Sequence, residues 1–179
     1  RCIFVTADKM GQEKISTLRA YGAEVVITPT AVEHDSPESY YSVSDRLAEE
    51  IPGGFKPDQY SNRANPEAHY LTTGPELWEQ TGGGELDAIV VSVGTGGSIS
   101  GIGRYFKERR PEVLIVGVDP EGSIYTADEE HPLHSYLVEG IGKDAWPETM
   151  DPAVVDRWIR VSDRDSFLTA RRLAQEEGL

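Results

Sequence analysis

The residues best suited to chemistry in this chain lie in a glycine-rich segment that follows an apolar run over residues 90–93. Glycine lacks a Cβ, so its backbone N–H group can approach an anion closely. A helical pattern begins directly after the glycines, and the first amides of a helix have no intrahelical acceptor. Hydroxyl groups add further donors. The spacing predicts a phosphate-binding turn composed of Gly94, Thr95, Gly96, Gly97 and Ser98.

The spacing of the glycines narrows the kind of phosphate ligand. A dinucleotide-binding turn requires G-x-G-x-x-G, but counting from Gly94 places Ile99 at the third glycine position. A P-loop requires a Gly-Lys-Ser or Gly-Lys-Thr ending, which the segment lacks. These mismatches disfavour a nucleotide-binding oxidoreductase and favour the single phosphate of a small cofactor. The alternative interpretation is a strand-to-helix turn whose glycines only allow tight packing.

Strand-like and helix-like segments alternate along the chain, which predicts an α/β fold with a parallel sheet and helices on both faces. Ligands of such folds bind beyond the carboxyl ends of the strands, where the glycine-rich segment lies. The expected strands are residues 2–6, 25–27, 87–93, 113–118 and 158–161, and the expected helices are residues 12–21, 37–50, 73–80, 98–108 and 163–177.

Local signals predict how several of these elements begin, end and pack. Gly22 is expected to close the first helix in a left-handed conformation, and Ser36 to cap the second. The polar residues 60–68 are expected to be irregular. The core candidates of the last helix are Phe167, Leu168 and Leu173.

A break in the pattern at residues 51–54, Ile-Pro-Gly-Gly, indicates a domain boundary. Residues 1–52 are expected to form part of a smaller N-terminal α/β subdomain. Residues 53–179 are expected to form part of a larger α/β subdomain that carries the phosphate-binding turn.

Composition excludes several classes of function. The formal net charge of −14 disfavours binding to nucleic acid or to an anionic membrane surface. The single cysteine, Cys2, cannot form an internal disulfide, which indicates a reducing compartment and a cytoplasmic location. Residues 128–134 gather carboxylates and histidines but match no compact metal motif, so we expect no metal site. The histidines His34 and His69 are interpreted as structural or surface residues.

Several motifs together resemble the fold-type II pyridoxal-phosphate enzymes that act at the β-carbon of serine derivatives, the cysteine synthase and cystathionine β-synthase family. The resemblance spans nearly the whole chain. It is carried by Asp8-Lys9-Met10 with Glu13-Lys14, Tyr21-Gly22-Ala23-Glu24-Val25, Asn65-Pro66 with His69-Tyr70, and Gly94-Thr95-Gly96-Gly97. Three further motifs resemble the cystathionine β-synthase branch more closely: Asp119-Pro120-Glu121-Gly122-Ser123-Ile124, Val138-Glu139-Gly140-Ile141-Gly142 and Val155-Asp156-Arg157-Trp158.

The resemblance implies a cofactor, a reaction and an assembly. It implies pyridoxal 5'-phosphate, held through its phosphate by residues 94–98, and a substrate bordered by Gln59, Tyr60, Gly140 and Gly142. The implied reaction is a β-replacement that condenses serine with homocysteine to cystathionine, the alternative being cysteine synthase, which joins sulfide to an activated serine. The implied assembly is a homodimer.

The same resemblance places the lysine that forms the Schiff base before Arg1. None of Lys9, Lys14, Lys56, Lys107 and Lys143 stands in the family's lysine context, and Lys143 replaces an aromatic residue of several relatives. No catalytic residue is therefore assigned within the chain. We expect a central fragment of a catalytic core that is inactive by itself. The second alternative is a catalytically inactive fragment that lacks the Schiff-base lysine and either folds only in part or binds anions weakly.

Overall fold

The computed structural model describes residues 1–179, which divide into two compact units. We call Arg1–Pro57 the N-terminal unit and Asp58–Leu179 the C-terminal unit. The sequence predicts the boundary after residue 52, whereas the contacts divide the chain after Pro57. None of the helices combines the length and the apolar character that a membrane span requires.

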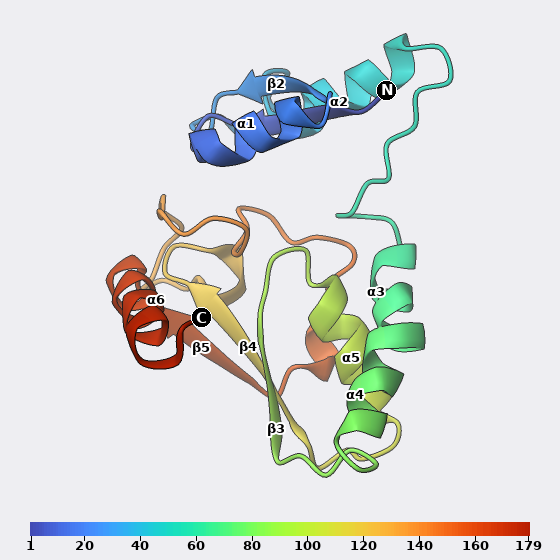
Figure 1. Ribbon diagram of the computed structural model, residues 1–179, viewed down its shortest axis with the longest axis vertical. Coiled ribbons are helices and arrows are strands. Elements are labelled where there is room, and N and C mark those ends of the chain that lie inside the picture. Colours follow the sequence, from blue (N-terminus) through green and yellow to red (C-terminus); the bar gives the residue numbers. More distant parts are fainter. The chain divides into compact units, whose positions relative to one another are not determined.

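The N-terminal unit pairs two parallel strands with two helices (Figure 1). Strand β1 aligns Ile3 with Glu24 of β2 and continues in register to Ala7 and Thr28. Gly22 adopts a φ of +84° just after the first helix, as the sequence predicts. The elements are β1 (Ile3–Ala7), α1 (Gln12–Ala20), β2 (Glu24–Thr28) and α2 (Tyr40–Glu50).

The predicted start of the second helix is wrong by three residues. Ser39, and not Ser36, is the N-cap of α2, because the Ser39 side chain accepts a hydrogen bond from the Ser42 amide. Ser36 instead closes the preceding turn, in which the Ser39 amide donates to the Ser36 carbonyl. Two serines spaced three residues apart offer the same capping signal, and only the chain path decides between them.

The C-terminal unit is built on a three-stranded parallel sheet in the order β3-β4-β5. Helices α3, α4 and α5 lie on one side of the strands and α6 on the other (Figure 1). The class predicted from the alternating pattern is confirmed. The elements are α3 (Ala64–Ala68), a π-helix η1 (His69–Thr73), α4 (Gly74–Gln80), β3 (Ala88–Ser92), α5 (Gly97–Lys107), β4 (Leu114–Pro120), the short 3₁₀ turns η2 (Ile124–Thr126) and η3 (Pro152–Val154), β5 (Arg157–Val161) and α6 (Asp163–Glu177).

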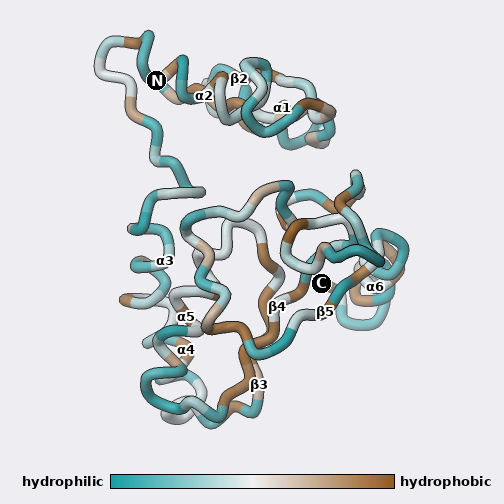
Figure 2. Tube along the Cα trace, turned by 180° about the vertical axis from the view of Figure 1, so that it is seen from behind, coloured by the Kyte–Doolittle hydropathy of each residue, from teal (hydrophilic) through white to brown (hydrophobic).

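The core of this unit lies between α5 and the sheet. Phe106 and Ile99 of α5 are fully buried with Ile115 of β4. Figure 2 shows hydrophobic residues along β3 and β4. Because parallel strands are covered on both faces, β4 is buried over most of its length, which agrees with its continuous apolar run.

Residues 60–68 are more regular than the sequence predicts. Helix α3 and the π-helix η1 run directly into α4, and both pack against α5. The segment has no apolar periodicity, so its helical state comes from tertiary packing and not from its own pattern. The expectation of an irregular segment is therefore wrong for its second half.

The last helix has the predicted bounds, but its core candidates are not buried. Phe167, Leu168 and Leu173 are each about half exposed. No residue of α6 is buried, because no element within residues 1–179 covers this face.

Candidate functional site

A hollow of about 320 Å³ lies where β3 ends and α5 begins. Its wall consists of residues 92–99, Gln59, Gly140 and Ile141. The position beyond the carboxyl end of a parallel strand is where ligands of this fold class bind. The whole predicted phosphate-binding turn forms part of the wall of this hollow. We call residues 94–98 the cradle.

The cradle has the backbone geometry of an anion site. Gly96 is the N-cap of α5 and adopts a left-handed conformation with a φ of +80°. The first intrahelical bond runs from the Ser100 amide to the Gly96 carbonyl. The amides of Gly97, Ser98 and Ile99 therefore precede the hydrogen-bonded turns and stand at the positive end of the helix.

Asn65 of α3 supports the cradle from behind. Its Nδ2 donates to Thr95 Oγ1 at 3.0 Å and to the Gln59 carbonyl at 2.7 Å. A Cβ at Gly97 would lie 1.9 Å from Asn65 Oδ1, so only glycine leaves room for this side chain. One asparagine thus links the cradle to the segment that carries Gln59.

Thr149 holds the other side of the same junction. Its hydroxyl, which is almost fully buried, lies 2.7 Å from the Thr95 carbonyl and 3.2 Å from the Tyr60 carbonyl, and its amide also donates to Tyr60. Neither Asn65 nor Thr149 is singled out as a site residue by the sequence. The motif containing Asn65 was the available signal, whereas Thr149 lies in a stretch without any motif.

The segment 140–142 closes the hollow opposite the cradle. A Cβ at Gly94 would lie 2.9 Å from the Gly140 carbonyl, and the Gly142 amide donates to the Val93 carbonyl at 2.8 Å. The Tyr125 hydroxyl donates to the Gly94 carbonyl at 2.6 Å. Residues far apart in sequence are therefore held together at the end of β3.

Seven of the nine residues that the sequence predicts for the site line this hollow: Gln59, Gly94, Thr95, Gly96, Gly97, Ser98 and Gly140. The other two lie next to it. The Tyr60 ring packs under the Lys143 ammonium group, with Nζ 4.4 Å from the ring centroid. Gly142 faces Pro120 and Tyr136, where a Cβ would collide.

Asp119 is a buried carboxylate at the carboxyl end of β4. Its Oδ2 accepts hydrogen bonds from the Thr126 amide and hydroxyl, at 3.1 Å and 2.8 Å, whereas Oδ1 has no hydrogen-bond partner. Burial raises the pKa of Asp119, and the nearby Ser123 hydroxyl, the bonds from Thr126 and the Arg160 charge oppose this effect only in part. Burial, aided by the nearby Asp119 charge, also raises the pKa of Tyr136 to about 12.

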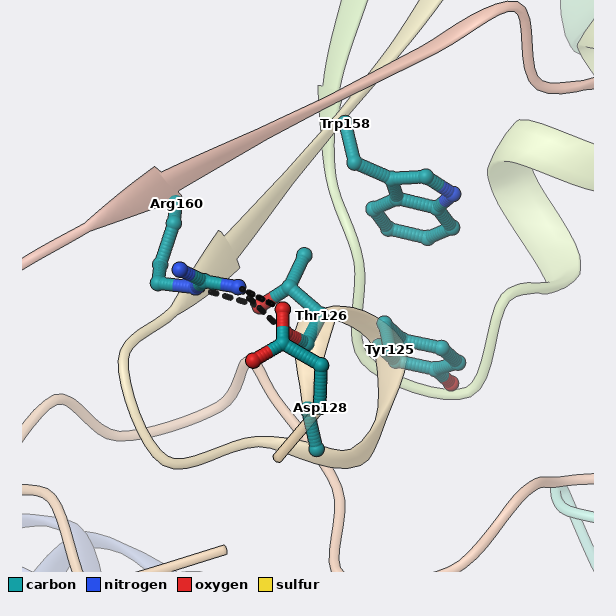
Figure 3. A pocket seen from close by; sticks show the side chains of 6 residues that line it. Tyr125, Thr126, Asp128, Trp158 and Arg160 are labelled. Atoms are coloured by element: carbon teal, nitrogen blue, oxygen red, sulfur yellow. Dashed lines mark hydrogen bonds and ion pairs between the residues drawn. The ribbon is translucent and has the colours of Figure 1, made fainter. Parts of the chain in front are cut away.

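A second hollow, of about 440 Å³, is lined by Tyr125, Thr126, Asp128, Trp158 and Arg160 (Figure 3). Arg160 donates to the Thr126 carbonyl and pairs with Asp128 at 3.3 Å, while Trp158 stacks on Tyr125 with ring centroids 5.2 Å apart. The charged groups of this second hollow are therefore paired with one another and present no unpaired charge to a ligand.

No group of three or more histidine, cysteine, aspartate and glutamate side chains in the chain is placed to hold a metal ion.

Comparison with known proteins identifies the family of this chain. The family model described as "Pyridoxal-phosphate dependent enzyme" matches residues 1–179. The chain belongs to this family. Cystathionine β-synthase of Oryctolagus cuniculus is 50% identical over 182 residues, and that of Saccharomyces cerevisiae is 45% identical over 186 residues. Both alignments cover 100% of this chain but only 33% and 37% of the relatives. The chain thus spans about a third of the length of these curated relatives.

Solved structures show the same fold. The O-acetylserine dependent cystathionine β-synthase of Helicobacter pylori superposes with a TM-score of 0.88 at 36% identity, covering 99% of this chain and 56% of that chain. O-ureido-L-serine synthase superposes with a TM-score of 0.88 at 30% identity, covering 100% and 55%. The predicted fold-type II architecture is confirmed.

Pyridoxal phosphate is the cofactor of this family, and the cradle suits its phosphate. The wall of the hollow contains no aspartate or glutamate, and the first turn of α5 carries no acidic residue. The donors available are the amides of Ser98 and Ile99 and the hydroxyls of Thr95 and Ser98. The Gly97 amide also points into the turn, where it makes a long hydrogen bond of 3.4 Å to Thr95 Oγ1.

Replacing Gly97 tests the fit between the cradle and Asn65. In Gly97→Ala the new methyl group displaces Asn65, so the bonds to Thr95 and Gln59 are lost and affinity for pyridoxal phosphate falls by about tenfold or more. Titration of the full-length apo-protein with the cofactor measures this change. Gly22→Ala is the matched control, because Gly22 has a strained φ but no atom within 4 Å of the new Cβ. Equal affinities for Gly97→Ala and the parent protein would contradict the assignment.

Replacing Asp119 tests its raised pKa. The folded state holds this proton more tightly than the unfolded state, so the stabilising contribution is complete below about pH 3.8 and is lost as pH rises through the folded pKa. The free energy of unfolding of the parent protein, relative to that of Asp119→Asn, is therefore expected to fall over this range. The fall is about 1.4 kcal/mol per unit of pKa difference. Denaturant unfolding between pH 3.5 and 7 measures it, and parallel pH profiles would show that the pKa is not raised.

Proposed function

We propose that this chain is the central part of a pyridoxal-phosphate enzyme that condenses serine with homocysteine to cystathionine. In this β-replacement the Cβ–O bond of serine breaks, a Cβ–S bond to homocysteine forms, and the hydroxyl leaves with one proton as water. The observation that carries the proposal is the acid-free cradle at the start of α5, in a chain 45–50% identical to cystathionine β-synthases.

The residues of the chain divide the work of binding. The cradle amides and the hydroxyls of Thr95 and Ser98 hold the phosphate, with Asn65 and Thr149 fixing the backbone around them. Gln59 and Gly140, which both line the hollow, border the substrate, with Tyr60 and Gly142 beside them. The cofactor, when bound, supplies an electron sink for charge that develops at the substrate Cα.

The lysine that binds the cofactor covalently is proposed to lie outside residues 1–179. The C-terminal unit contains two lysines, and neither lines the hollow. Lys107 donates to the Pro111 and Val113 carbonyls and pairs with Asp156 at 2.7 Å. Lys143 lies over the Tyr60 ring.

We further propose that the full-length protein is a cytoplasmic homodimer.

Borohydride trapping locates this lysine. Reduction of the full-length protein with pyridoxal phosphate converts the Schiff base into a stable adduct, and peptide mass mapping identifies the modified residue. The expected adduct lies on a peptide outside residues 1–179, and residues 1–179 expressed alone should acquire none. A stoichiometric adduct on Lys107 or Lys143 would overturn this part of the proposal.

The second candidate is a cysteine synthase, which joins sulfide to an activated serine. The observation that favours it concerns the first substrate: the similar solved structure from Helicobacter pylori is titled a cystathionine β-synthase, but one that depends on O-acetylserine, an activated serine. Both candidates use the same cradle, and they differ in the nucleophile and in the leaving group of the serine substrate.

Turnover by the full-length protein separates the two candidates. We expect cystathionine to form from homocysteine faster than cysteine forms from sulfide, with serine and O-acetylserine each tried as first substrate. Chromatographic measurement of both products decides the question, and Gly97→Ala serves as the control that lacks an intact cradle. Turnover with sulfide alone would establish the cysteine synthase reading instead.

A further inference from the structure

His69 connects the cradle to the helical segment behind it. The imidazole Nε2 lies 3.0 Å from Ser98 Oγ, and Nδ1 lies 2.9 Å from Thr73 Oγ1. Both ring nitrogens are thus engaged by hydroxyl groups, which fixes the ring plane. The interpretation of His69 as a structural or surface residue does not account for its contact with a cradle side chain.

The backbone brings this ring to the cradle by an unusual route. His69 begins the π-helix η1, a conformation that occurs frequently at functional sites. Close approach of η1 to α5 depends on Gly101, where a Cβ would lie 2.7 Å from His69 Cβ and 2.2 Å from the Pro66 carbonyl oxygen. A residue with a side chain at position 101 would therefore prevent η1 from packing this closely against α5.

The two cradle hydroxyls are supported in the same manner. Thr95 Oγ1 accepts a hydrogen bond from Asn65 Nδ2, an amide nitrogen that can only donate. The Thr95 hydroxyl hydrogen is consequently left for another acceptor. Ser98 has a single hydroxyl hydrogen as well, and its direction depends on whether His69 Nε2 carries a proton.

We propose that His69 is a positioning residue for the cofactor phosphate: its Nε2–H group donates to Ser98 Oγ and thereby directs the Ser98 hydroxyl hydrogen at the phosphate. In the opposite tautomer the Ser98 hydroxyl would donate its hydrogen to His69 Nε2, and Ser98 would offer the phosphate only lone pairs. The inference rests on the proposed phosphate role of the cradle.

The test compares dissociation constants of the full-length apo-protein for pyridoxal phosphate and for pyridoxal, which lacks the phosphate. His69→Leu is expected to weaken binding of pyridoxal phosphate about tenfold and to leave pyridoxal binding within about twofold. Ser98→Ala should cause a similar loss. The double variant should bind no more weakly than Ser98→Ala alone, because both changes remove the same interaction.

Two conservative variants separate positioning from structural support. In His69→Gln the amide nitrogen reaches the place of Nε2 and should restore most of the affinity, whereas in His69→Asn it occupies the place of Nδ1 beside Thr73 and should not. Restoration by Asn as complete as by Gln, additive losses in the double variant, or an equal loss for pyridoxal would overturn the proposal. A parent protein that binds the two compounds equally well would instead overturn the proposed phosphate site itself.

Discussion

Close approach of α5 to its neighbours is the constraint on which the C-terminal unit depends. The helix must begin at the end of β3 with its first amides uncovered, and it must be buried between the sheet and the segment α3–η1 along most of its length. Glycines stand where a side chain would collide with those neighbours: Gly97 opposite Asn65, Gly101 opposite Pro66 and His69, and Gly103 opposite Val154. Such glycines weaken the helix intrinsically, so their number indicates that proximity outweighs propensity here.

The cradle is suited to an anion although the chain as a whole is strongly negative. A protein with a formal net charge of −14 repels anions at long range, yet the hollow at the start of α5 has no acidic residue in its wall. Short-range donors then dominate, since long-range repulsion is screened over about 8–10 Å at ordinary ionic strength. The buried acid of this region, Asp119, is instead tied to Thr126 and has a raised pKa.

Much of the fold could be predicted from sequence because the strongest elements carry their own signals. The apolar run of β4, the glycine turn before α5 and the left-handed Gly22 are local features, and each is found where it was expected. The segment α3–η1 was missed because its helical state depends on packing against α5. Asn65, Thr149 and His69 were missed as cradle neighbours for the same reason: their partners are distant in sequence.

The last helix was predicted correctly as an element, but the burial of its side chains was not. Its apolar pattern correctly predicted a helix, but a pattern does not say whether the chain itself supplies the cover, and Phe167, Leu168 and Leu173 stay half exposed. The choice between Ser36 and Ser39 as cap was likewise undetermined by local residues alone.

The central claim is that the residues at the start of α5 bind the phosphate of pyridoxal phosphate. A crystal structure of the full-length protein with this cofactor measures it most directly. The expected result is a phosphate within hydrogen-bond distance of the Gly97 and Ser98 amides and the Ser98 hydroxyl. A cofactor whose phosphate is bound elsewhere, with residues 94–98 in contact with solvent only, would contradict it.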